Sequence, residues 1–154
     1  MIPGDRLICL FIDDFKAGQT FHDWPLHITI VPWFRTQPTT GVLSIAIQEK
    51  LAGIEPFTAN IGEEAGFGHK GKKLVNLVDL PSPLQKIEHI ARDVLHAAGS
   101  WIVDETTQQK RPFRPHVTVQ GSNRLHKGDT VACKTLYIVE QQGEHKEIVD
   151  KIIL

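Results

Sequence analysis

One short pattern occurs twice in this 154-residue chain. Residues 25–30 read PLHITI and residues 114–119 read RPHVTV, so both segments place a proline, a histidine and a threonine among β-branched residues. Alternate side chains of a β-strand point to opposite faces, so the histidine and threonine of each segment share one face. The fold must therefore accommodate two strands that each present an imidazole and a hydroxyl group. The residues concerned are His27, Thr29, His116 and Thr118.

The segments around the two motifs alternate between strand-like and helix-like patterns, which predicts an α+β fold in the order β-β-α-β-β-α-β-β-β. No Pro/Gly/Ser-rich linker interrupts this order, so we expect one domain spanning residues 1–154. Strands are expected at 6–15, 26–34, from 57 into a glycine-rich loop, and at 72–80, 111–119, 131–141 and 146–154; helices are expected at 39–54 and from 81 to Gly99.

The two expected helices differ in the strength of their pattern. The first follows a threonine that can cap it, with Val42, Ile45, Ala46 and Leu51 recurring at helical spacing. The second begins at a Pro-Ser-Pro entry signal and has a continuous apolar face. That face consists of Leu84, Ile87, Ile90, Ala91, Val94 and Leu95.

Composition limits the class of protein. With 41% hydrophobic and 23% charged residues the chain has the profile of a soluble globular domain. A net charge of -1 argues against a protein that coats duplex nucleic acid, but it is compatible with a small anionic ligand or a nucleic acid end. The N-terminal apolar run is too short for a signal peptide or a membrane helix, so we expect a cytoplasmic protein. Cys9 and Cys133 are expected to be buried free thiols, with a disulfide as the alternative.

The paired motifs suit phosphodiester chemistry. An imidazole titrates near pH 6.5, so one histidine can act as a general base while the other, protonated, acts as a general acid. Threonine hydroxyls can donate hydrogen bonds to anionic oxygens. A single histidine on a strand is more often a satisfied buried residue than a catalyst, but its repetition with the same neighbours favours the catalytic interpretation.

In HITI and HVTV the sequence resembles the two-histidine (2H) phosphoesterase superfamily, which includes 2'-5' RNA ligase-like proteins and cyclic nucleotide phosphodiesterases. The resemblance implies a bilobed α+β fold with pseudo-twofold symmetry, in which antiparallel sheets line a central cleft and helices pack outside. It also implies chemistry without metal or cofactor on 2',3'-cyclic phosphates or 2'-5' linkages, with reverse 2'-5' RNA ligation as a further activity. The partner would be a nucleotide or an RNA end that carries such a phosphate.

Carried over to this chain, the resemblance makes His27 and His116 the acid–base pair, while Thr29 and Thr118 hold phosphate oxygens. We assign His116 to activate the attacking water and His27 to protonate the leaving oxygen. Pseudo-symmetry would let these roles exchange with the orientation of the substrate.

Three further residues are candidate substrate contacts. Arg114 lies two positions before His116 and would share its face if the strand begins that early; a solvated basic turn is the alternative. Phe67 could stack on a base, and His69, Lys70, Lys72 or Lys73 could approach a phosphate; a solvated hairpin loop is the alternative. Trp33 could form a stacking wall beyond the first motif, or pack in the core.

Two other sites are rejected from the sequence. GFGHKG at 66–71 matches a dinucleotide-binding pattern, but a strand rather than a helix is expected after it. The eight histidines include no close ligand pair of the zinc-binding type, so no metal is expected. Two rivals to the leading function remain: a nucleotide- or RNA-end-binding module without turnover, and a phosphodiesterase for a non-nucleotide cyclic phosphate such as ADP-ribose 1'',2''-cyclic phosphate. We expect a monomer.

Overall fold

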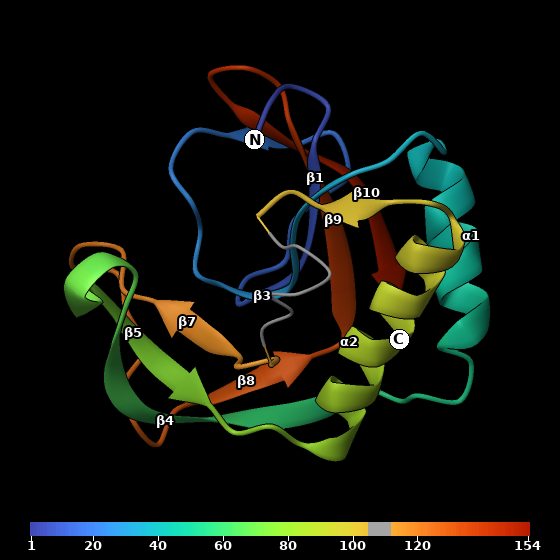
Figure 1. Cartoon of the computed structure of the whole chain (residues 1–154). Coiled ribbons are helices and arrows are strands. Elements are labelled where there is room, and N and C mark those ends of the chain that lie inside the picture. Colours follow the sequence, from blue (N-terminus) through green and yellow to red (C-terminus); the bar gives the residue numbers. More distant parts are fainter. Residues whose placement is uncertain (105–111) are drawn as a thin grey trace.

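The computed structural model describes residues 1–104 and 112–154, in which ten strands and two α-helices follow one another (Figure 1). None of these helices is long and apolar enough to cross a membrane. The elements are β1 (Arg6–Phe11), β2 (Thr20–Phe21), β3 (His27–Arg35), α1 (Thr40–Lys50), β4 (Phe57–Phe67), the 3₁₀ helix η1 (His69–Gly71), β5 (Lys73–Val78), α2 (Ser82–Ala97), β6 (Trp101–Ile102), β7 (His116–Thr118), β8 (Thr130–Cys133), β9 (Thr135–Gln141) and β10 (Lys146–Ile153).

The strands form one curled sheet in the order β2-β10-β9-β1-β3-β7-β5-β4-β8, with β6 added to β3. All pairings between these strands are antiparallel. The two motif strands, β3 and β7, are neighbours at its centre, so the two lobes expected from the resemblance join there. The α+β prediction is confirmed.

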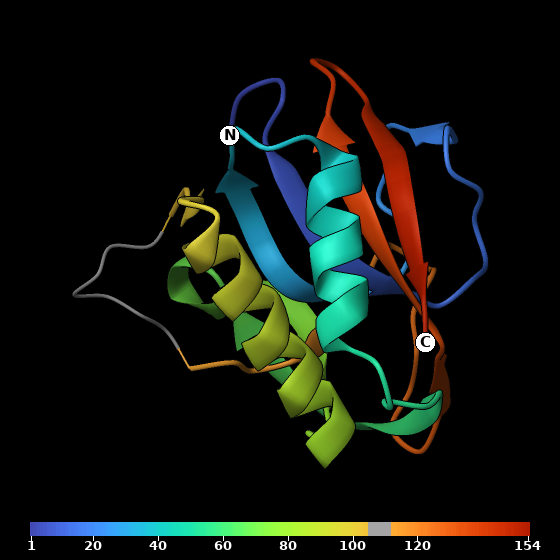
Figure 2. The same cartoon turned by 90° about the vertical axis from the view of Figure 1, so that its right-hand side faces the viewer.

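Both helices cover the same side of the sheet, where they also contact each other (Figure 2). The main core lies between them and the strands: Ile28 and Val117 of the motif strands are buried there together with Leu84 and Ile87 of α2. Burying such side chains contributes about 1.5–3 kcal/mol each. The opposite faces of β3 and β7 are thereby left to the polar residues of the motifs.

Helix α1 forms as predicted, and Leu51 of its predicted apolar positions is buried, but the rest of the buried face differs from the prediction. Thr39 caps it, accepting a hydrogen bond from the backbone N–H of Val42 at 3.4 Å. Leu43 and Ile47 face the core, whereas Val42 and Ile45 are 59% and 61% exposed. Apolar residues lie on several sides of this short helix, so spacing alone does not select a face, and packing against β10 and α2 decides it.

The glycine-rich segment after residue 57 is also more regular than expected. Strand β4 continues through it to Phe67 and forms a hairpin with β5. Gly66 is needed there, because a β-carbon at that position would clash with the backbone of Gly71. The GFGHKG segment is thus a hairpin turn followed by a strand, as its rejection as a dinucleotide-binding motif predicted.

The second motif strand is shorter than predicted. β7 begins at His116 rather than at residue 111, which lies outside the described residues. Pro112 and Pro115 lack backbone N–H groups and so cannot donate to a strand ladder, which accounts for the late start. Arg114 therefore precedes the strand, and strand alternation does not determine its direction.

Candidate active site

The pairing of β3 with β7 brings the two motifs together. Ile28 lies opposite Val117, and both are buried on the helix side. One residue to either side in this antiparallel register, His27 lies across from Thr118, and Thr29 lies across from His116. Opposed residues in such a pair have Cα atoms about 4.5–5.5 Å apart. The four motif side chains therefore form one compact group on a single face of the sheet.

Each histidine is oriented by its own chain segment. Nδ1 of His27 lies 2.8 Å from the carbonyl oxygen of Pro25, and Nδ1 of His116 lies 2.9 Å from that of Arg114. A carbonyl oxygen only accepts hydrogen bonds, so each Nδ1 carries the hydrogen and Nε2 of each neutral ring is an acceptor. Both imidazoles are thus ready to take a proton at Nε2.

The two histidines differ in their surroundings. Burial lowers the pKa of His27 from 6.5 to about 4, with smaller contributions in the same direction from the charges of His116 and Lys73. Burial also lowers the pKa of His116, helped by the charges of Lys73 and Arg114. In both cases the hydrogen bond to the backbone carbonyl opposes the shift. These shifts favour the neutral forms of both imidazoles.

An aromatic ring packs against each imidazole, and a cation lies over each ring. Trp24 lies 4.3 Å from His27 between ring centroids, and Phe67 lies 4.4 Å from His116. The ammonium group of Lys146 is 5.5 Å from the Trp24 ring, and the guanidinium carbon of Arg114 is 4.9 Å from the Phe67 ring. The two halves of the site repeat the order cation, aromatic ring, imidazole.

The structure brings two of the three candidate substrate contacts, Arg114 and Phe67, next to His116. The third, Trp33, is half-buried in an apolar cluster and lies 6.1 Å from Trp24 between ring centroids. The structure thus places Trp33 in the packing around Trp24. It supports Trp24, which in turn contacts His27.

Sequence reasoning missed Trp24 and Lys146. Trp24 sits three residues before His27, and this short spacing is a signal that could have pointed to it. Lys146 has no such signal, because it reaches the loop before β3 from β10. There its ammonium group also donates to the carbonyl oxygen of His22 at 3.4 Å.

A pocket of about 170 Å³ opens beside the His27 half. Its lining residues are Phe11, Ile12, Asp13, Asp14, Ala132, Lys134, Thr135 and Tyr137. The ring of Phe11 is also 6.1 Å from that of His27 between centroids.

Within residues 1–104 and 112–154, no group of three or more His, Cys, Asp or Glu side chains is arranged to hold a metal ion. Cys9 and Cys133 are both buried free thiols, as predicted, and burial raises the pKa of each. Neither thiol is therefore an additional nucleophile of this site.

Comparison with known proteins places this geometry in a family. The family model described as the 2'-5' RNA ligase superfamily matches residues 5–144, a range that includes both motifs. No curated protein matches the sequence. Several solved structures share the fold, although their sequences are distant from this one.

One is a crystal structure described as a phosphoesterase, 15% identical with a TM-score of 0.60 over 99% of each chain. TT0787 of Thermus thermophilus is 15% identical, with a TM-score of 0.64 over 97% of each chain. E. coli LigT, complexed with 3'-AMP, is 14% identical, with a TM-score of 0.60 over 99% of each chain. With the family model covering most of its length, this chain belongs to the 2'-5' RNA ligase superfamily of 2H phosphoesterases.

Proposed function

We propose that this chain is a metal-independent phosphoesterase that hydrolyses 2',3'-cyclic phosphate or 2'-5' phosphodiester bonds in RNA ends or nucleotides. The observation that carries the proposal is the antiparallel pairing of the two His-x-Thr strands, which assembles two imidazoles and two hydroxyls on one face. Membership of the family supports a phosphoesterase- or ligase-like enzyme. The nucleotide complexes of LigT, with 3'-AMP, NADP+ and ATP, support a nucleotide as the ligand class.

The reaction needs one base and one acid. One neutral imidazole takes a proton from water at Nε2 while the water oxygen forms a bond to phosphorus. The bond from phosphorus to the leaving ribose oxygen breaks, and that oxygen receives a proton from the second, protonated imidazole. Attack by a 5'-hydroxyl on a cyclic phosphate, in place of water, gives the ligation product by the same steps.

The difference in burial supports a particular division of labour. His27, with a pKa near 4, is neutral at neutral pH and suits the general base. His116 is the more accessible of the two and suits the general acid, since a bound phosphate anion can stabilise its protonated form. This assignment reverses the one made from the sequence, which had no information on burial.

The remaining residues would bind the phosphate and its substituents. Thr29 and Thr118 donate hydrogen bonds to the non-bridging oxygens, whose charge grows during attack. Arg114 can leave the ring of Phe67 to contact an anionic oxygen and thereby free that ring for stacking on a base.

A substrate screen tests the proposal. The purified protein is assayed with EDTA present on 2',3'-cyclic nucleotides, 2'-5' and 3'-5' dinucleotides and RNAs that end in a cyclic phosphate. His27→Ala and His116→Ala should each lower activity by about 10²–10⁴-fold. His96→Ala, at an exposed position of α2, is the matched control and should retain activity.

Each result has a distinct meaning. Full activity in either motif variant would exclude the two-histidine mechanism, and loss of activity with EDTA would exclude metal independence. Binding of a nucleoside 2'-phosphate without hydrolysis of any substrate in the panel would instead identify a binding module.

A further inference from the structure

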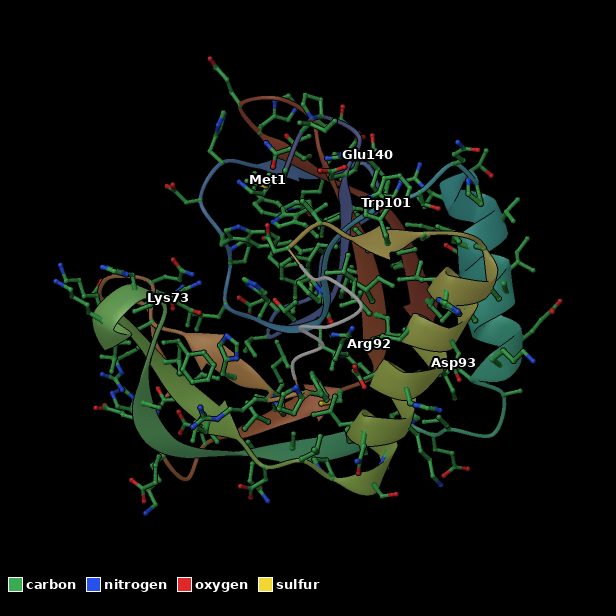
Figure 3. All side chains as sticks on the ribbon, in the orientation of Figure 1. Met1, Lys73, Arg92, Asp93, Trp101 and Glu140 are labelled. Carbon is green, nitrogen blue, oxygen red and sulfur yellow. The ribbon has the colours of Figure 1, made fainter. Side chains whose placement is uncertain are left out.

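Lys73 is a cation on the same face of the sheet as the second motif. It begins β5, where it lies opposite Phe67 of β4. Two residues further along β5, Val75 pairs with Thr118 of β7, and side chains two positions apart in a strand share a face. Lys73 therefore lies beyond Thr118, diagonally across the strand pair, and Figure 3 shows it at the β5 end beside β7.

Its partner on β4 ties this position to the histidines. Phe67, directly opposite Lys73, has its ring centroid 4.4 Å from that of His116, so the curl of the sheet brings this end of the β4–β5 hairpin over the second motif. A lysine side chain has a long apolar stem that can lie along such a ring while its charged end stays in water. The ammonium group is thus within reach of the space between the two motifs.

Lys73 is also exposed, and among the residues that the structure describes it has no carboxylate partner. Within residues 1–104 and 112–154, Lys127 and Lys134 form ion pairs with acidic side chains, whereas Lys73 forms none. Its charge lowers the pKa of both His27 and His116, whereas that of Arg114 acts on His116 alone. A cation without an ion-pair partner that lowers the pKa of both histidines is well placed to bind an anion that lies between them.

We propose that Lys73 binds a non-bridging oxygen of the substrate phosphodiester and that this contact couples the arrival of the phosphate to uptake of the proton that the leaving oxygen needs. The charge of Lys73 by itself opposes protonation of both imidazoles. A bound phosphodiester anion offsets that charge, so the proton needed by the leaving oxygen is taken up when substrate arrives. This inference rests on the proposed function and extends it to a residue outside the motifs.

The charged and titratable groups around the histidines fit this role. Lys73 approaches from β5, Arg114 from the segment before β7, and Lys146 from β10 by way of the Trp24 ring. The ring of Tyr137 of β9 contacts that of Phe11, and the charge of His116 acts on His27. The named charges that shift the two histidines are all positive, so the substrate itself supplies the negative charge.

The test separates loss of charge from loss of structure. Lys73→Met and Lys73→Gln remove the cation, Lys73→Arg keeps it, and Lys86→Met, at an exposed position of α2, is the matched control. The pKa values of His27 and His116 are followed by imidazole NMR in the free proteins. Affinity for inorganic phosphate is then measured at pH 7, and kcat/KM on the best substrate of the screen.

Removing the cation should raise the pKa of both histidines, weaken phosphate binding by about 10-fold or more and lower kcat/KM, with recovery in Lys73→Arg. Unchanged pKa values in both Met and Gln variants, or phosphate affinity equal to that of Lys86→Met, would overturn the inference. If the parent hydrolyses no substrate, the proposed function fails, while the NMR titration and the phosphate affinity still decide the role of Lys73.

Discussion

The two halves of the candidate site use the same local sequence in different surroundings. The His27 half is enclosed by Trp24 and Phe11, which belong to an aromatic cluster on β1, β9 and the loop before β3. The His116 half has Phe67 alone as its aromatic neighbour among the residues that the structure describes, with Arg114 on the outside. A duplicated motif thus provides two chemically equal groups, and the packing around them makes their acidities unequal.

The largest effect should come from removing each histidine and following kcat/KM against pH. For the parent, activity should fall on the acidic side as the general base is protonated, and on the alkaline side as the general acid is deprotonated. In His27→Gln the fall of kcat/KM on the acidic side, near pH 4, should disappear. In His116→Gln the fall on the alkaline side, which begins below pH 6.5, should disappear. Each variant should also lose about 10²–10⁴-fold in rate. If His27→Gln instead removed the alkaline fall and His116→Gln the acidic fall, His27 would be the general acid and His116 the general base.

The two halves are expected to be equal in one respect: Thr29 and Thr118 each donate a hydrogen bond to the phosphate. Thr29→Val and Thr118→Val keep the shape of the side chain and remove one donor to a charged oxygen. Each should lower kcat/KM by about 10- to 100-fold, since hydrogen bonds to charged groups contribute about 1.5–3 kcal/mol. Thr58→Val, on an exposed position of β4, is the control in the same assay. A loss confined to one motif would show that the phosphate contacts only one half.

The low pKa of His27, which distinguishes it from His116, can also be measured through folding stability, without any substrate. The pKa of His27 is about 4 in the folded protein and 6.5 in an unfolded chain, so below pH 6.5 the unfolded state binds more protons. Stability is therefore lost as pH falls from 6.5 towards 4, by about 2 kcal/mol at pH 5 from this group. Urea unfolding at pH 7 and pH 5 should show a smaller loss in His27→Gln than in the parent. An equal loss in both proteins would indicate that His27 is not held neutral.

The smallest effects should come from the aromatic rings. Trp24→Leu admits water to His27 and should raise its pKa towards 6.5, because burial is the main cause of its low value. Phe67→Leu should likewise raise the pKa of His116. The change should be smaller, because the imidazole of His116 is already more accessible than that of His27. Imidazole NMR measures both, and rates should fall by about 2- to 10-fold. Equal shifts at the two histidines would contradict the difference between the halves.

The motif residues were predictable because strand alternation is local: His27 and Thr29 share a face whatever else the chain does. Helix α2 was predictable for a similar reason, since Leu84 and Ile87 belong to one clear apolar stripe. Local patterns contain no information on which strands pair, so the register of Ile28 against Val117 could not be derived. The buried face of α1 and the approach of Lys146 to Trp24 depend in the same way on tertiary packing.

The hydrogen bonds from Nδ1 to the carbonyl oxygen two residues earlier have a consequence for how such a site can change. In each motif a three-residue segment holds its own imidazole through a backbone carbonyl rather than through a carboxylate from elsewhere in the chain. The surrounding loops can therefore be lengthened, exchanged or given new side chains while the ring keeps its direction. An unchanged reactive centre can in this way be combined with many recognition surfaces, which makes the loops around β3 and β7 suitable places to engineer substrate preference.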